Sequence, residues 1–118
     1  MTKEFWLPGY TPPSLNTLLG KGHWSRDEFK EEASEYAGIF VKGLKGATLK
    51  SLSYVFYFPD KKARDNDNYC AKYLTDALRY HGVLVEDDSK HTGPSTYFIE
   101  WNNPEKKHGT KIIMEVAE

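Results

Sequence analysis

The sequence predicts one α+β domain, residues 1–118, with a small mixed β-sheet and two main helices in the order β-α-β-α-β-β. Three observations support this class. The chain has 118 residues, which is the size of a single domain. Its composition, 39% hydrophobic and 28% charged, is typical of a globular protein. Segments rich in β-branched and aromatic residues alternate with two segments whose apolar residues recur at helical spacing.

The strand segments are short and mostly bounded by turn-forming residues. We expect the last two strands to be joined by the hairpin-like loop "NNPEKKHG". A further apolar run, "VLV", is a candidate minimal strand at 83–85. The predicted strands are "EFWL" (4–7), "LKSLSYVFYFP" (49–59), "STYFIEW" (95–101) and "TKIIMEV" (110–116).

The first helix is predicted over residues 26–42. Ser25 and Glu28 have the spacing of a capping box, and Gly43 and Gly46 follow as helix-ending residues. Between them, apolar residues recur every three or four positions. These are Phe29, Ala33, Tyr36, Ala37, Phe40 and Val41.

The second helix is predicted to begin near Asn68 and to stop at Gly82. Lys72, Asp76 and Arg79 fall on its polar side. The start of this helix follows the densely charged stretch "KKARDNDNYC" (61–70) directly. The predicted apolar face consists of Tyr69, Tyr73, Leu74, Ala77, Leu78 and His81.

Asp65 and Asp67 lie two positions apart in this stretch. On extended backbone both carboxylates face the same side and can share one Mg²⁺ ion, which prefers oxygen ligands. The alternative interpretation is that Asp67 or Asn68 caps the second helix. An EF-hand does not fit, because Cys70 stands where that loop requires glycine.

A second acidic cluster, "EDD" (86–88), follows the second helix and can deliver a third carboxylate to the same cation. Three acids and Mg²⁺ form an arrangement suited to phosphodiester hydrolysis. Lys72 can point back toward the acids or contact phosphate. The alternatives are a solvated acidic turn and an ordinary surface lysine.

The stretch from Pro59 to Ser89, "PDKKARDNDNYCAKYLTDALRYHGVLVEDDS", resembles the core of RusA-type Holliday junction resolvases. The segments "PPSLN" and "WSRDEFKEEASEY" also resemble that family, in the same order along the chain. The resemblance implies a RusA-like fold and a homodimer that binds four-way DNA junctions. It also implies symmetric nicking of two strands with Mg²⁺ as cofactor.

Carried over to matching positions, the resemblance implies a complete site. Asp65, Asp67 and Asp87 are the expected metal-binding catalytic acids, and Lys72 is the expected catalytic lysine. The expected DNA-binding residues are Lys61, Lys62, Arg64, Asn68 and, in the "PPSLN" loop, Asn16.

Bulk composition limits the other function classes. The net charge of −1 does not indicate a nucleic-acid binder, although a local basic patch is sufficient for phosphate contacts. The competing interpretation is therefore a catalytically weak or inactive DNA-junction-binding module of the same fold. With one cysteine no internal disulfide forms, and the four histidines lack metal-ligand spacing. No apolar stretch is long enough to cross a membrane, so we expect a cytoplasmic protein of a bacterial cell or phage-infected host.

Overall fold

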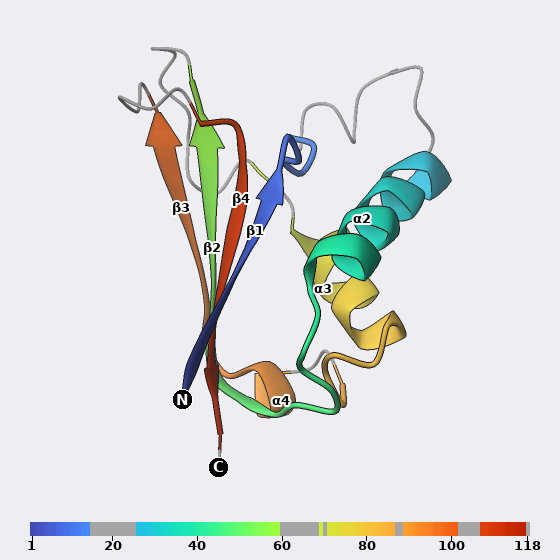
Figure 1. Cartoon of the computed structure of the whole chain (residues 1–118), viewed down its shortest axis with the longest axis vertical. Coiled ribbons are helices and arrows are strands. Elements are labelled where there is room, and N and C mark those ends of the chain that lie inside the picture. The colour runs from blue at the N-terminus through green and yellow to red at the C-terminus, as the bar shows by residue number, and fades with distance from the viewer. Residues whose placement is uncertain (15–25, 60–68, 70, 87–88, 102–106, 118) are drawn as a thin grey trace.

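The computed structural model describes residues 1–14, 26–59, 69, 71–86, 89–101 and 107–117. Within these residues it is a small α+β domain with a mixed four-stranded sheet (Figure 1). The elements are, in chain order, β1 (Thr2–Pro8), α2 (Arg26–Phe40), β2 (Leu49–Phe58), α3 (Lys72–Tyr80), α4 (Ser89–Thr92), β3 (Ser95–Trp101) and β4 (Gly109–Val116).

The strands lie in the order β1-β4-β2-β3, so β2 and β4 occupy the centre of the sheet. β4 is antiparallel to both β1 and β2, whereas β3 is parallel to β2. The hairpin expected between the last two strands is therefore wrong, because β2 lies between β3 and β4. β2 is the longest strand and has the longest buried row, which favours a central position for it.

One face of the sheet is covered by helices and forms the core. Figure 1 shows α2 and α3 on the same side of the sheet, and α4 near the end at which β2 begins. Residues of β2 alternate between the two faces, as the sequence predicts, with Tyr54 and Phe56 fully buried toward the helices. Leu52, Ile112 and Met114 complete the buried inner face beside them.

Two helix boundaries differ from the sequence prediction. α2 ends at Phe40 rather than at residue 42, and Gly43, with φ of +86°, lies in the turn that follows. α3 begins at Lys72, not near Asn68. The predicted minimal strand at 83–85 is only an isolated bridge, in which Leu84 lies beside Ala47. No helix in the described part of the chain is long and apolar enough to span a membrane.

Gly93 joins α4 to β3 at a point where the chain passes close to β2. Its φ is +66°, and a Cβ atom there would overlap the backbone carbonyl oxygen of Lys50. Leu52 donates its N–H to the carbonyl of Pro94 at 3.0 Å, which fixes the chain at this distance. Only glycine meets both requirements, because it has no Cβ atom and tolerates positive φ.

We expect Gly93→Ala to lower the free energy of unfolding by more than about 3 kcal/mol, since backbone strain and overlap add together. Gly43→Ala is the matched control, because Gly43 also has positive φ but has no atom within 4 Å of the Cβ position. The control should lose only about 1–2 kcal/mol. Urea denaturation measures both, and equal losses would contradict the close approach.

Candidate active site

Several segments meet at the end of the sheet where β2 ends. The loop after β1 approaches the residue before β4, since Gly9 donates its N–H to the His108 carbonyl at 2.8 Å. Further along that loop, Ser14 forms an isolated antiparallel bridge with Tyr69. The "PPS" segment therefore lies beside the chain just before α3, although the two are far apart in sequence.

Tyr69 is held against the end of β2 by aromatic packing. Its ring centroid lies 5.2 Å from that of Phe58 and 6.2 Å from that of Phe56. Phe58 is also 6.3 Å from the His108 ring. Both described residues nearest to the stretch 60–68, Pro59 before it and Tyr69 after it, thus belong to this end of the sheet.

α3 starts without help from an acidic cap. Its N-cap residue is Ala71, which makes no side-chain capping hydrogen bond. Thr75, in the first turns of the helix, donates its hydroxyl to the Ala71 carbonyl at 3.1 Å. The interpretation that Asp67 or Asn68 caps this helix is therefore wrong, because the helix begins four residues or more beyond them.

Lys72 is the only predicted site residue among those that the structure describes. It is the first residue of α3, and its side chain is 70% exposed. Its Nζ lies 3.2 Å from Asp76 Oδ2, one helical turn along. A lysine at a helix N-terminus opposes the helix dipole, which favours anions there. Asp76 offsets part of that cost.

The remaining predicted site residues lie outside the described part of the chain, so their roles stay predictions. Ser14, two residues before Asn16, and Tyr69, two residues after Asp67, are nevertheless paired in the structure. The residues concerned are Asp65, Asp67, Asp87, Lys61, Lys62, Arg64, Asn68 and Asn16.

Glu86, the described residue of the second acidic cluster, lies near the C-terminal end of α3. Arg79, in the last turn, forms an ion pair with Glu86 at 2.5 Å between Nε and Oε1. Val85 donates its N–H to Ala47, just before β2, at 3.1 Å. A helix of 9 residues is about 13 Å long. The described neighbours of the two acidic clusters thus lie at opposite ends of α3.

The described residues do not form a metal site of their own. Among them, no group of three or more His, Cys, Asp or Glu side chains could hold an ion. His81 bonds to the Ser34 carbonyl at 2.9 Å through Nε2, and His108 lies 3.5 Å from Thr11 Oγ1. A three-ligand cation site would therefore need residues outside the described part of the chain, to which Asp65, Asp67 and Asp87 belong.

The chain was compared with protein-family models and with curated proteins, and neither comparison finds a match.

A partly buried hydrogen bond connects β2 to the start of α3, and no sequence pattern predicts it. Thr75 already donates to the Ala71 carbonyl, so its oxygen accepts from the Tyr54 hydroxyl, at 2.6 Å. Burial raises the pKa of Tyr54, and its bond to Thr75 acts in the opposite direction. The pair fixes the first turn of α3 over the central strand.

We expect Tyr54→Phe to lower the free energy of unfolding by about 1 kcal/mol, because Thr75 loses its buried donor. Tyr57→Phe is the matched control on the same strand, since Tyr57 lies on the opposite, half-covered face. That control should be nearly neutral. Chemical denaturation measures both, and a neutral Tyr54→Phe would contradict the role of the bond.

α2 carries a concentration of acidic residues toward solvent. Partial burial raises the pKa of Glu32, and the charge of Glu35, three residues along, raises it further.

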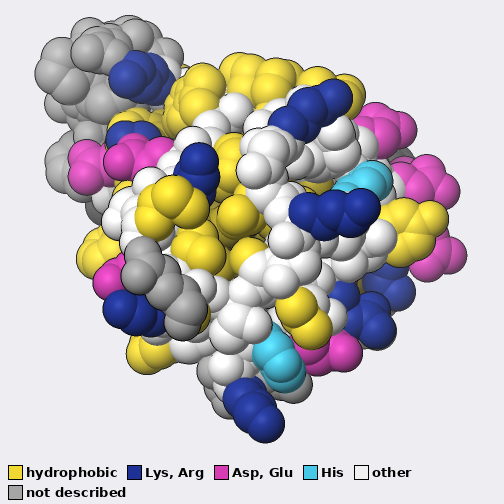
Figure 2. Space-filling model, turned by 60° about the horizontal axis from the view of Figure 1, so that its bottom comes forward, with side chains coloured by type: hydrophobic (Ala, Val, Ile, Leu, Met, Phe, Trp, Pro, Cys, Tyr) yellow, Lys and Arg dark blue, Asp and Glu magenta, His cyan; other side chains and the backbone are white. Residues whose placement is uncertain are grey.

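Figure 2 shows one face of the molecule, on which lysine and arginine side chains are distributed among acidic ones instead of forming one basic area. A phosphate-binding surface is not evident on this face.

The raised pKa of Glu32 has a direct consequence for stability. The folded state holds this proton more tightly than the unfolded chain, so stability falls as pH rises from the ordinary carboxyl pKa through the raised one. Glu32→Gln should remove that fall and stabilise the protein at pH 7 by about 0.2–0.5 kcal/mol, the usual cost of a like-charge helical pair. Thermal melts from pH 3.5 to 7.5 test this, with Glu100→Gln on β3 as control. An unchanged pH profile for Glu32→Gln would refute it.

Proposed function

We propose that this protein is a Mg²⁺-dependent, structure-selective endodeoxyribonuclease that resolves four-way DNA junctions, similar to RusA-type resolvases, in recombination and repair or in phage DNA processing. The proposal draws on the motif resemblance and on the arrangement of the described residues around the acidic stretch. The small α+β domain with a mixed four-stranded sheet is compatible with the proposal at the level of fold class.

The main structural support for this proposal is the position at which α3 begins. Ala71 is the N-cap of α3, so helix capping does not account for the acids of "RDNDN". Like charges placed so close together repel each other unless a cation or hydrogen-bond donors offset the charge. Because Asp67 and Asn68 do not cap α3, a cation-binding role is the simpler explanation for Asp65 and Asp67.

Asp65, Asp67 and Asp87 would hold the Mg²⁺, since carboxylate oxygens are the ligands it prefers. When bound, the ion lowers the pKa of a coordinated water and offsets charge on the phosphate. The two acidic clusters must converge for this, within one chain or between the chains of a homodimer. The dimer also accounts for paired cuts, because its two-fold axis presents two equivalent sites to related strands.

Lys72 and the basic run have electrostatic roles in this proposal. Lys72 at the start of α3 would neutralise charge that develops on the scissile phosphate. Its side chain is 70% exposed, and an exposed ion pair such as that with Asp76 contributes little stability. Lys61, Lys62 and Arg64 would hold the flanking backbone, with Asn68 and Asn16 beside them. Binding should therefore weaken steeply as salt increases.

The direct test is cleavage of a synthetic four-way junction in Mg²⁺. We expect wild-type protein to introduce paired nicks, and Asp67→Asn to reduce the rate at least a hundredfold, since a lost carboxylate ligand weakens metal binding. Asp27→Asn, in the first turn of α2, is the matched control and should cut normally. Mg²⁺ should raise the melting temperature of wild type and not that of Asp67→Asn.

Two other outcomes would overturn the proposal in different ways. Equal junction binding with and without Mg²⁺, and no cleavage, would support the DNA-binding module instead. Wild-type cleavage by Asp67→Asn would remove that residue from the site. Linear duplex of the same sequence serves as the substrate control, because a structure-selective enzyme leaves it uncut.

A further inference from the structure

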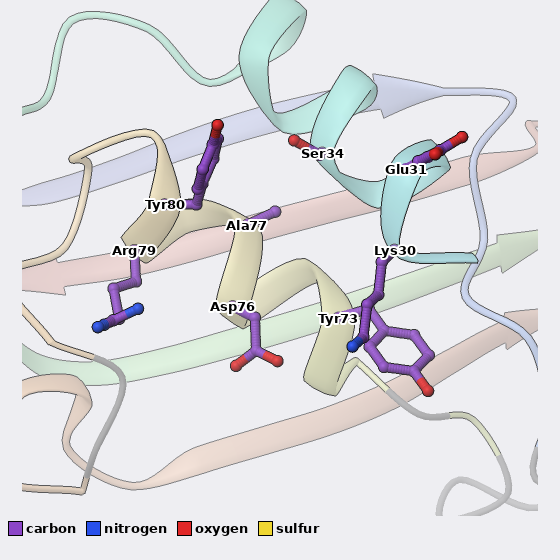
Figure 3. A pocket seen from close by; sticks show the side chains of 8 residues that line it. All are labelled: Lys30, Glu31, Ser34, Tyr73, Asp76, Ala77, Arg79 and Tyr80. Carbon is purple, nitrogen blue, oxygen red and sulfur yellow. The ribbon is translucent and has the colours of Figure 1, made fainter. Parts of the chain in front are cut away.

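A groove opens between α2 and α3 on the surface of the helical layer. Its main hollow has a volume of about 550 Å³ and lies between the two helices (Figure 3). It is lined by Lys30, Glu31 and Ser34 of α2 and by Tyr73, Asp76, Ala77, Arg79 and Tyr80 of α3. A second hollow of about 430 Å³ shares Glu31 and Ser34 with it and continues along α2. Because they share these residues, the two hollows adjoin, and together they are called the groove.

Small residues and exposed apolar side chains line the groove. Ser34, Gly38 and Ala77 are the small ones, and a Cβ atom at Gly38 would lie 3.0 Å from the His81 ring. Tyr80 is 78% exposed, the highest value among the described large hydrophobic residues, and Ile39 is 60% exposed. Isolated exposed residues need no explanation, but here two of them border a hollow.

The α2 side of the groove is acidic beyond what the helix itself requires. Asp27 and Glu28 lie in the first turn, where they favour the helix dipole. Glu31, Glu32 and Glu35 lie further along, where the dipole gives no such benefit. Their spacings of three and four residues bring like charges together, and this destabilises the helix. A third hollow of about 390 Å³ is lined by this row of glutamates.

We propose that the groove between α2 and α3 is the docking site for a basic amphipathic helix of a partner protein. Apolar side chains of that helix would pack on Tyr80 and Ile39, and its lysines or arginines would pair with Glu31 and Glu35. Those glutamates are one turn apart, about 6 Å along the axis, which matches basic residues spaced by four on a partner helix lying alongside. Charge complementarity identifies the class of partner.

The same charges disfavour the other occupants. Nucleic acid and anionic lipid would bring phosphate against the glutamate row, which repels it. Of the two basic residues in the main hollow, Arg79 is already ion-paired with Glu86, and Lys30 lies over the Tyr73 ring. A second copy of this chain does not offer the required element within the described residues. α2 is itself acidic, α4 has 4 residues, and the apolar side of α3 is buried in its own core. The inference does not rest on nuclease activity.

The test uses a synthetic leucine-lysine peptide of about 18 residues with an amphipathic helical pattern, and the full chain labelled with ¹⁵N. We expect peptide-induced shifts at Ser34, Gly38, Ala77 and Tyr80, and a saturable dissociation constant from fluorescence anisotropy. A leucine-glutamate peptide of the same pattern should bind at least tenfold more weakly. A scrambled leucine-lysine peptide, which is not amphipathic as a helix, should do the same.

Two variants and two controls locate the binding. Tyr80→Ala and the double variant E31Q/E35Q should each weaken the peptide about tenfold, as for a central contact and for lost charge pairs. Phe98→Ala and Glu115→Gln, on the sheet, are the matched controls and should bind normally. Thermal melts verify that all four variants are folded.

Three results would overturn the inference. The first is equal weakening by variants and controls, or shifts confined to the sheet. The second is groove shifts that depend on protein concentration without peptide, which would assign the groove to self-association. The third is groove shifts caused by duplex DNA. The assay measures binding without cleavage, so its failure is distinguishable from failure of the proposed nuclease.

Discussion

The packing of the β2 inner face against α3 is the constraint on which the rest of the structure depends. Tyr54 and Phe56 are fully buried there, and the ring of Tyr69 lies between those of Phe56 and Phe58. Aromatic burial of this size supplies much of the stability of a 118-residue domain. The hydroxyl of Tyr54 would oppose its own burial, and the bond to Thr75 removes that cost while fixing α3 over the strand.

This packing determines where α3 can begin. Tyr69 is occupied with the aromatic row and with Ser14, so the chain does not turn into the helix until Ala71. The described residues on either side of the acidic stretch, Phe58 and Tyr69, are therefore both anchored at the same end of the sheet. Functional loops are usually attached to a rigid scaffold in this way, which agrees with the proposed site.

The sequence alone predicted those elements that are defined by local periodicity. The alternation in β2 and the three-to-four spacing in α2 predicted both elements within a few residues. The partner of β3 could not be predicted, because the short gap before β4 favours a hairpin, whereas pairing with β2 is decided by the core. The start of α3 was also predicted wrongly. Asp67 and Asn68 are favourable N-cap residues by type, but the tertiary contacts of Tyr69 place the helix start further along the chain. For the candidate site, only Lys72 and the neighbours of the acids can be compared with the structure.

The near-neutral total charge conceals an acidic excess on one helix. α2 holds five acidic residues against two basic ones, so the rest of the chain has 14 basic residues against 12 acidic ones. A protein that binds DNA gains from keeping acids away from the phosphates, because each repulsive contact weakens association. Concentrating the acids on one helix would serve both proposals, since it would keep these carboxylates away from DNA and give α2 a surface that favours basic partners. The net charge of −1 is thus compatible with a phosphate-binding face elsewhere on the molecule.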